Sequence, residues 1–189
     1  MLDLLQYQDL ETLVAAHVQC EACRLRQQCK QVVIHRGNPQ GRLMLVGEGP
    51  GAQEDEQGKP FVGAAGQLLD KILDAAQLPL EEVYITNVVK CRPPSNRLPK
   101  PDEIRTCLPW LQRQIELIEP RMLICLGSVA ARTLIDPDIR ITRERGKWLR
   151  YGEIDIIATF HPAALLRDPA KKRPVWEDFK AIRDRYLQW

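Results

Sequence analysis

The feature that most constrains the fold is a short apolar run followed by a long glycine-rich loop. Residues 42–46 are too few for a buried helix and suit a buried parallel strand, and Gly47 follows directly. Residues 47–63 therefore form a loop at a strand's carboxyl end, where ligands bind in open α/β sheets. Its glycines let the backbone approach a flat ligand, while its four acidic residues argue against a phosphate. The alternative is a solvated surface loop.

Short apolar runs alternate with helical patterns along the rest of the chain. Further strands are expected over residues 83–89, 122–126 and 154–160, and helices over residues 8–18, 64–73, 102–118, 129–134 and 175–187. This alternation predicts a parallel sheet with right-handed crossovers, covered by helices on both faces. The 189 residues fit a single domain, 1–189, in which residues 8–30 form an N-terminal helix and a cysteine knuckle that we expect a metal cluster to tie to the core.

Charge and composition limit the classes of function. A net charge of +2 is too small to require a nucleic-acid partner, so any basic footprint must come from local clusters such as residues 140–150. The N-terminus lacks a basic segment followed by an apolar run, and no stretch approaches 18 apolar residues. We therefore expect a cytoplasmic protein that has no membrane association.

Four of the six cysteines form two pairs. Cys20 and Cys23 are separated by two residues, Cys91 and Cys107 by fifteen, and 67 residues lie between the pairs. In a chain without a secretory signal, such pairs indicate metal ligation more than disulfides. Spacing alone does not separate a four-cysteine zinc site from a [4Fe–4S] cluster. Cys29 is a further thiol near the first pair, so it could replace one of the four paired cysteines as a ligand.

Three side chains stand out beside the glycine loop. Phe61 lies among glycines with little core to join, which suits a stacking surface. Asn87 ends the second strand and His161 follows the fourth, so both belong at the carboxyl edge of the sheet. The plainer alternatives are a turn residue for Asn87 and a structural role for His161.

Together these motifs closely resemble the family 4 uracil-DNA glycosylases, the iron–sulfur branch of that superfamily. The matching segments are residues 47–55, 58–63, 86–94 and 161–163. The resemblance implies a three-layer α/β/α fold around a four-stranded parallel sheet. It implies a monofunctional, monomeric enzyme that flips uracil out of DNA and hydrolyses its N-glycosidic bond, leaving an abasic site for base excision repair. Residues 92–100 lack the histidine by which one relative is trapped on its product, so ordinary turnover is expected.

The resemblance also implies roles for individual residues. It places a [4Fe–4S] cluster on Cys20, Cys23, Cys91 and Cys107. It makes Glu48, His161 and, as a second carboxylate, Glu54 catalytic, and its substrate contacts are Glu48, Gly49, Pro50, Phe61, Asn87 and His161. It adds DNA contacts from Arg97, Lys100, Arg143, Lys147 and Arg167, and a wedge from Leu165 and Leu166, for which the alternative is the first core turn of a helix.

Two other classes of protein compete with this interpretation. One is a nucleotide-binding Rossmann-like protein with a structural zinc, in which residues 49–51 would form an anion nest. The acidic residues after that nest, and the absence of a Gly-Lys-Ser/Thr motif, argue against it. The other is a non-catalytic metal-bound DNA-binding module, which would not require Glu48, Asn87 and His161 at three separate strand ends.

Overall fold

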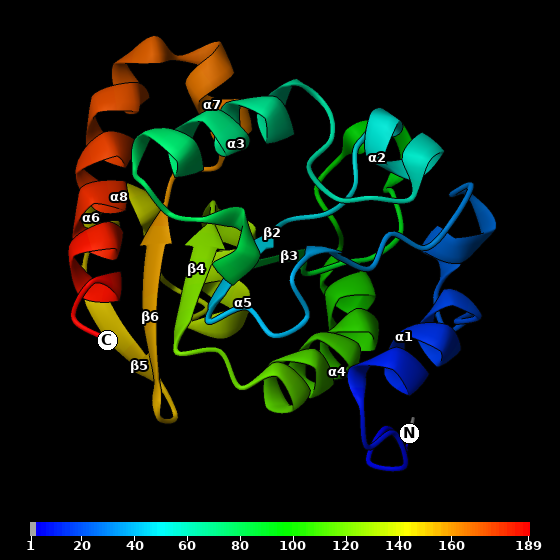
Figure 1. Ribbon diagram of the computed structural model, residues 1–189. Helices are drawn as coiled ribbons and strands as arrows, with labels where there is room; N and C mark the ends of the chain where they lie inside the picture. Colours follow the sequence, from blue (N-terminus) through cyan, green and yellow to red (C-terminus); the bar gives the residue numbers. More distant parts are fainter. Residues whose placement is uncertain (1–2) are drawn as a thin grey trace.

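A computed structural model describes residues 3–189, which form an α/β/α sandwich around one six-stranded sheet (Figure 1). The strand order is β1-β3-β2-β4-β6-β5. The strands are β1 (Arg36–Gly37), β2 (Leu43–Gly47), β3 (Val83–Asn87), β4 (Met122–Leu126), β5 (Trp148–Tyr151) and β6 (Ile154–Thr159). The four central strands are parallel, and β1 and β5 pair antiparallel at the edges. The predicted fold class and parallel centre are confirmed, but four strands was too few because the short edge strands were missed.

The helices include all five expected from the sequence. The α-helices are α1 (Leu10–Val18), α2 (Ala52–Gln57), α3 (Ala64–Ala75), α4 (Pro101–Ile118), α5 (Ser128–Leu134), α6 (Ile141–Glu144), α7 (Pro162–Arg167) and α8 (Lys172–Tyr186). Short 3-10 turns are η1 (Arg24–Gln27), η2 (Leu80–Glu82), η3 (Pro94–Asn96) and η4 (Pro169–Lys171). Between residues 3 and 189, no helix combines the length and apolar character needed to cross a bilayer.

Alternate residues of each central strand face opposite helical layers. Along β2, Leu43 and Leu45 belong to a core with α3, α7 and α8, whereas Met44 and Val46 belong to a core with α4 and α5. The period of two along a strand sorts these side chains, and burial on both faces requires the uninterrupted apolar runs seen in the sequence. Each fully buried Leu or Val contributes about 1.5–3 kcal/mol, so both layers hold the sheet firmly.

The N-terminal helix packs on the outer side of α4. Leu13 is buried against Trp110, and the His17 ring stacks on the Trp110 ring at 4.0 Å between centroids. The sequence predicts that a metal cluster ties this segment to the core. The structure shows that apolar packing of α1 on α4 attaches it, a contact that the sequence pattern did not reveal.

The order of the strands determines where a ligand can bind. The chain passes from β2 to β3 on one side and then returns to β4 on the other side of β2. At such a reversal, the loops that leave neighbouring strands diverge and open a crevice at the carboxyl edge. The predicted position of residues 47–63 at the carboxyl end of β2 is confirmed.

Candidate active site

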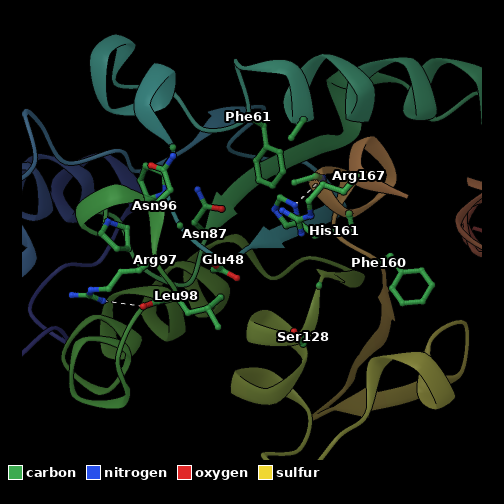
Figure 2. A pocket seen from close by; sticks show the side chains of 18 of the residues that line it. Glu48, Phe61, Asn87, Asn96, Arg97, Leu98, Ser128, Phe160, His161 and Arg167 are labelled. Atoms are coloured by element: carbon green, nitrogen blue, oxygen red, sulfur yellow. Dashed lines mark hydrogen bonds between the residues drawn. The ribbon is translucent and has the colours of Figure 1, made fainter. Parts of the chain in front are cut away.

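One pocket lies at the carboxyl edge of the four parallel strands. Its volume is about 620 Å³, and it is bounded by the segments that follow β2, β3, β4 and β6. Figure 2 shows Glu48, Phe61, Asn87 and His161 around this hollow; Glu48 and Phe61 come from the loop after β2, Asn87 from the end of β3, and His161 from the segment after β6. The structure therefore brings together the polar and aromatic residues that the sequence placed at separate strand ends. Gly49 and Pro50, two of the predicted substrate contacts, also line the pocket.

Phe61 is held in an unusual backbone conformation. Its φ angle is +57°, and its ring stacks on the His161 ring at 5.4 Å with 28° between the planes. A side chain at Gly66 would lie 1.8 Å from the Phe61 carbonyl oxygen, so α3 can approach this turn only with glycine there. Phe61 is only 5% exposed and belongs to the core cluster with α3. The expectation that it has little core to join is wrong, although its ring also borders the pocket.

Asn87 ends β3 with its side chain buried and incompletely bonded. The residue is 1% exposed, and its Oδ1 atom has no hydrogen-bond partner among the described residues. Leaving a buried acceptor unpaired costs about 1–3 kcal/mol, which a ligand with an N–H group would recover. The amide lines the pocket, so that N–H group would have to come from the pocket's occupant. The alternative of a turn residue bonded to nearby backbone does not describe this side chain.

The four acids of the glycine loop have different environments. Glu54 Oε1 accepts from the Val62 and Gly63 N–H groups at 2.9 and 2.8 Å, and Oε2 accepts from Gly51 N–H at 3.2 Å. Asp55 is buried and accepts from Lys30 N–H, and Glu56 forms an ion pair with the Lys30 side chain. These three carboxylates order the loop.

Glu48 is the acid that remains free to act in the pocket. It lines the pocket, and no hydrogen bond to its carboxylate occurs within residues 3–189. Burial raises the pKa of Glu48, and the positive charge of Arg167 partly opposes this shift. A carboxylate with few partners and a raised pKa suits a role in chemistry better than a role in loop structure.

His161 caps the first turn of α7. Its Nδ1 atom accepts from the Ala163 N–H at 3.1 Å, so in the neutral ring the proton is on Nε2. Burial and the Arg167 charge lower the pKa of His161 to about 4, while Glu54 opposes the shift. At neutral pH, His161 is therefore an uncharged donor through Nε2–H.

The end of β6, which delivers His161, is held by a buried carboxylate. Asp178 of α8 is 2% exposed and accepts from Thr159 Oγ1 at 2.5 Å and from Arg145 Nε at 2.9 Å. A side chain on Gly146 would meet Asp178 Oδ1 at 2.5 Å, which explains the glycine beside Arg145. Arg145, part of the basic segment 140–150, therefore pairs with a carboxylate of the same chain.

A second, smaller cavity brings the four paired cysteines together. Cys20, Cys23, Cys91 and Cys107 all border it. Burial raises the pKa of Cys107 to about 11 and raises that of Cys91, and in both cases neighbouring thiols add to the shift. Free thiols crowded in this way resist ionisation, and coordination to metal would stabilise their thiolate form.

The four paired cysteines are the residues at this cavity that could hold a metal group, because thiolates are ligands both for zinc and for iron–sulfur clusters. In the part of the chain that the structure describes, no group of three or more His, Cys, Asp or Glu side chains is arranged to hold a single metal ion. Cys29 is buried beside Cys91 but does not border the cavity, and Cys125 lies in β4.

Comparison with known proteins identifies the family. A family model described as the uracil DNA glycosylase superfamily matches residues 34–180. A type-4 uracil-DNA glycosylase from Sulfurisphaera tokodaii is 42% identical over 185 residues, covering 93% of this chain and 84% of the relative. One from Thermotoga maritima is 43% identical over 183 residues, covering 93% and 94%. The chain belongs to the type-4 uracil-DNA glycosylases. The resemblance drawn from its motifs is confirmed.

A type-5 relative matches this type-4 glycosylase over a smaller region. The type-5 uracil-DNA glycosylase from Thermus thermophilus is 35% identical over 114 residues, which is 52% of either chain. The type-4 relatives instead cover nearly the whole chain, including the N-terminal cysteine segment that lies outside the family model.

Two of the side chains predicted to contact DNA are engaged inside this type-4 glycosylase. Leu165 is 2% exposed in the core with α3 and α8, whereas Leu166 is 50% exposed. Of the two leucines predicted as a wedge, Leu165 instead takes the alternative role of a core residue, because α7 begins at Pro162 and turns Leu165 toward the sheet. Arg97 donates to both oxygens of buried Glu103 at 2.8 and 2.7 Å, so this side chain braces its own loop.

The other predicted DNA contacts lie on the surface of this type-4 glycosylase. Lys100, Arg143 and Lys147 are exposed, although Lys147 pairs with Glu144 at 2.9 Å. Arg167 is exposed at the rim of the pocket. Sequence reasoning missed Leu98, which is 65% exposed at the same rim, because a lone leucine in a proline-rich loop carries no periodic signal.

Proposed function

We propose that this protein is a DNA repair glycosylase that flips uracil out of DNA and hydrolyses its N-glycosidic bond, releasing uracil and leaving an abasic site. The observation that carries the proposal is the buried, unpartnered Asn87 Oδ1, which borders one pocket together with the stacked rings of Phe61 and His161. A base has a flat face for stacking and a polar edge for hydrogen bonds, and extrusion from the helix presents both to a pocket.

Uracil recognition is assigned to Phe61 and Asn87. The Phe61 ring would stack on the flipped base, a contact worth about 1–3 kcal/mol. The Asn87 amide would accept from uracil N3–H and donate to O4. Cytosine has an acceptor at N3 and a donor at N4. The acceptor oxygen of the Asn87 amide would then face another acceptor, and its donor nitrogen would face another donor. Gly49 and Pro50 line the same pocket.

Departure of the base is assigned to His161. As the C1′–N1 bond breaks, uracil leaves as an anion with charge on O2. The neutral imidazole donates from Nε2–H, since Nδ1 is already occupied by the Ala163 N–H. One preorganised donor of this kind is worth roughly 10²–10³ in rate.

The sugar side of the reaction is assigned to Glu48. Its carboxylate would stabilise the positive charge that develops on the deoxyribose and would orient the water whose oxygen adds to C1′. Glu54, the second candidate, has both oxygens committed to backbone N–H groups. We therefore propose that Glu54 acts by holding the loop.

Cys20, Cys23, Cys91 and Cys107 would hold a [4Fe–4S] cluster. When bound, the cluster supplies iron–thiolate bonds that join the N-terminal knuckle to the loop after β3 and to α4. Glycosidic hydrolysis transfers no electrons, so the role that we propose for it is structural. Residues 1–189 would then act as one domain and as a monomer.

DNA would lie across the rim of the pocket. Exposed Lys100, Arg143, Lys147 and Arg167 would neutralise phosphates without sequence preference. We place the apolar wedge at Leu166, which is half-exposed next to the buried Leu165. Such a side chain can fill the gap that the flipped base leaves in the stack.

The test is incubation with matched oligonucleotides that contain uracil or thymine, followed by alkali, which cleaves the strand at abasic sites. Strand cleavage is expected with the uracil substrate alone, and Asn87→Ala should abolish it while keeping the melting temperature. Two results would overturn the proposal: no cleavage by the iron-containing protein, or equal cleavage of both substrates.

A further inference from the structure

Lys90 is a buried cation between the two cavities. Its side chain is 1% exposed, and its Nζ donates to Thr86 Oγ1 at 2.8 Å and to the Asn87 carbonyl oxygen at 2.5 Å. Both acceptors are neutral. No Asp or Glu carboxylate pairs with Lys90 in the part of the chain that the structure describes. A buried charge is costly unless an opposite charge accompanies it, so Lys90 requires a nearby anion.

The anion can come from the cavity that Lys90 borders. Lys90 lines the same cavity as the four paired cysteines. Four thiolates on an iron–sulfur core carry a net negative charge, which a neighbouring ammonium group would balance. The negative charge of a cysteine-bound cluster and the positive charge of Lys90 would therefore neutralise each other, and without the other each would be an unpaired buried charge.

Lys90 also fixes the main chain that carries the uracil-recognition side chain. The segment from Thr86 to Lys90 is hydrogen-bonded to the pocket strand, because the Val88 and Val89 N–H groups donate to the Gly47 and Glu48 carbonyl oxygens at 2.9 and 3.1 Å. The ammonium group closes this turn from inside through the Asn87 carbonyl. Removing it would leave that buried oxygen without a partner and release the end of β3.

We propose that Lys90 is a positioning residue that couples the two sites: its ammonium group is the countercharge of the cysteine-bound cluster and holds Asn87 in place for uracil. The second half of this inference rests on the proposed function, whereas the first half does not. The alternative is a local brace with no connection to the cluster. That alternative predicts a loss of stability in Lys90 variants but no change in the properties of the iron.

Three substitutions separate charge from hydrogen bonding. Lys90→Met removes both, Lys90→Gln keeps a donor for the Asn87 carbonyl but no charge, and Lys90→Arg keeps the charge. Lys180→Met, on the outer face of α8, is the matched control. The cluster readouts are iron and sulfide per chain, the rate of iron release to a chelator, and the midpoint potential. The pocket readouts are single-turnover excision per iron-loaded molecule and the uracil-to-thymine selectivity.

We expect Lys90→Met to release iron about tenfold faster or more, in the range typical of residues that support metal ligands. Its midpoint potential should become more negative, since a nearby cation favours the reduced cluster. Lys90→Gln should share the change in potential but keep more excision, and Lys90→Arg should restore the potential. Wild-type iron release and potential in both neutral variants would overturn the countercharge. Unchanged excision per iron-loaded Lys90→Met molecule would overturn the link to Asn87.

A measurement on the wild-type protein covers the case in which the neutral variants do not fold. Hydrogen exchange of the Val88 and Val89 amides would be compared before and after chelation of the iron. Faster exchange at these two amides than at Ile124 in β4 is expected, and equal change at all three would overturn the coupling. Because these readouts need no DNA substrate, their failure is distinguishable from a failure to excise uracil.

Discussion

A side-chain carbon on Gly47 would lie 2.4 Å from Oδ1 of Asn87, its partner across the β2–β3 ladder. The same carbon would lie 2.5 Å from Cζ of Phe61. Glycine at this register position therefore leaves the space in which the recognition amide and the stacking ring meet. The pocket depends on a missing side chain as much as on those that are present.

Gly47→Ala should reduce uracil excision by about 100-fold, because a displacement of about 1 Å in a positioned group can cost that much. The residue is buried, so overpacking should also destabilise the fold by about 1–3 kcal/mol. Single-turnover excision and thermal unfolding would measure the two effects. Gly152→Ala is the control for a glycine substitution away from the pocket: no atom lies within 4 Å of a side chain there, but φ is +57°, so it should lose some stability and keep wild-type excision. Wild-type excision by Gly47→Ala would contradict this account of the pocket.

Asn87→Asp should lower uracil excision by about 10-fold to 100-fold, since about 1–3 kcal/mol is lost when a buried group faces the wrong partner. The carboxylate accepts where the amide donated to O4, so weak excision of cytosine is also expected. Paired assays on uracil and cytosine oligonucleotides would measure both. Unchanged excision of uracil would remove Asn87 from the recognition site.

Regular patterns made most of the fold predictable. The four parallel strands, and the position of Asn87 and His161 at their carboxyl ends, follow from the apolar runs and from the residues that bound each run. The sequence does not show which face of α7 points toward the sheet. Leu165 and Leu166 are adjacent, and which of them is buried depends on the start of the helix at Pro162. The Arg97–Glu103 pair was equally hidden, since it depends on positive φ angles at Ser95 and Asn96.

The fall in excision rate at low pH, the acid limb of the pH profile, should be set by protonation of Glu48. Its carboxylate must be ionised, and burial raises its pKa, so excision should fall at a higher pH than an exposed glutamate would give. His161 loses its neutral form only near its pKa of about 4. Arg167→Gln removes the charge that opposes the Glu48 shift and should move the limb to higher pH. Glu48→Gln should be slow and lack the limb; an unchanged limb in this variant would assign it elsewhere.

His161→Ala should slow excision by roughly 10²–10³ while leaving DNA affinity almost unchanged, because its donor acts mainly on the departing base. Glu48→Ala acts on the sugar side of the same transition state. The double variant should therefore be faster than the product of the two single effects predicts, as is usual for residues that act as a unit. Single-turnover rates and binding of a uracil-containing duplex would be compared. A loss of affinity in proportion to rate would make both residues binding elements.

Cys91→Ala should lower the iron content and the melting temperature together, because Cys91 borders the cysteine cavity and begins the loop at the pocket rim. Cys125→Ala is the control for losing a buried thiol, and it should keep its iron because Cys125 lies in β4 away from that cavity. Cys29→Ala should also keep its iron. Iron assays and thermal unfolding would decide. A Cys91→Ala protein without iron but with wild-type melting would show that the cluster does not support the fold.

The two antiparallel edge strands have a consequence for the behaviour of the protein at high concentration. An open sheet edge is a template on which other chains can add strands and begin to aggregate. Here β1 is two residues long and carries Arg36, and β5 is four residues long and carries Arg150. Short, charged edges discourage such strand addition. None of the four strands that carry the pocket is itself an edge, so the catalytic end of the sheet is shielded from this kind of self-association.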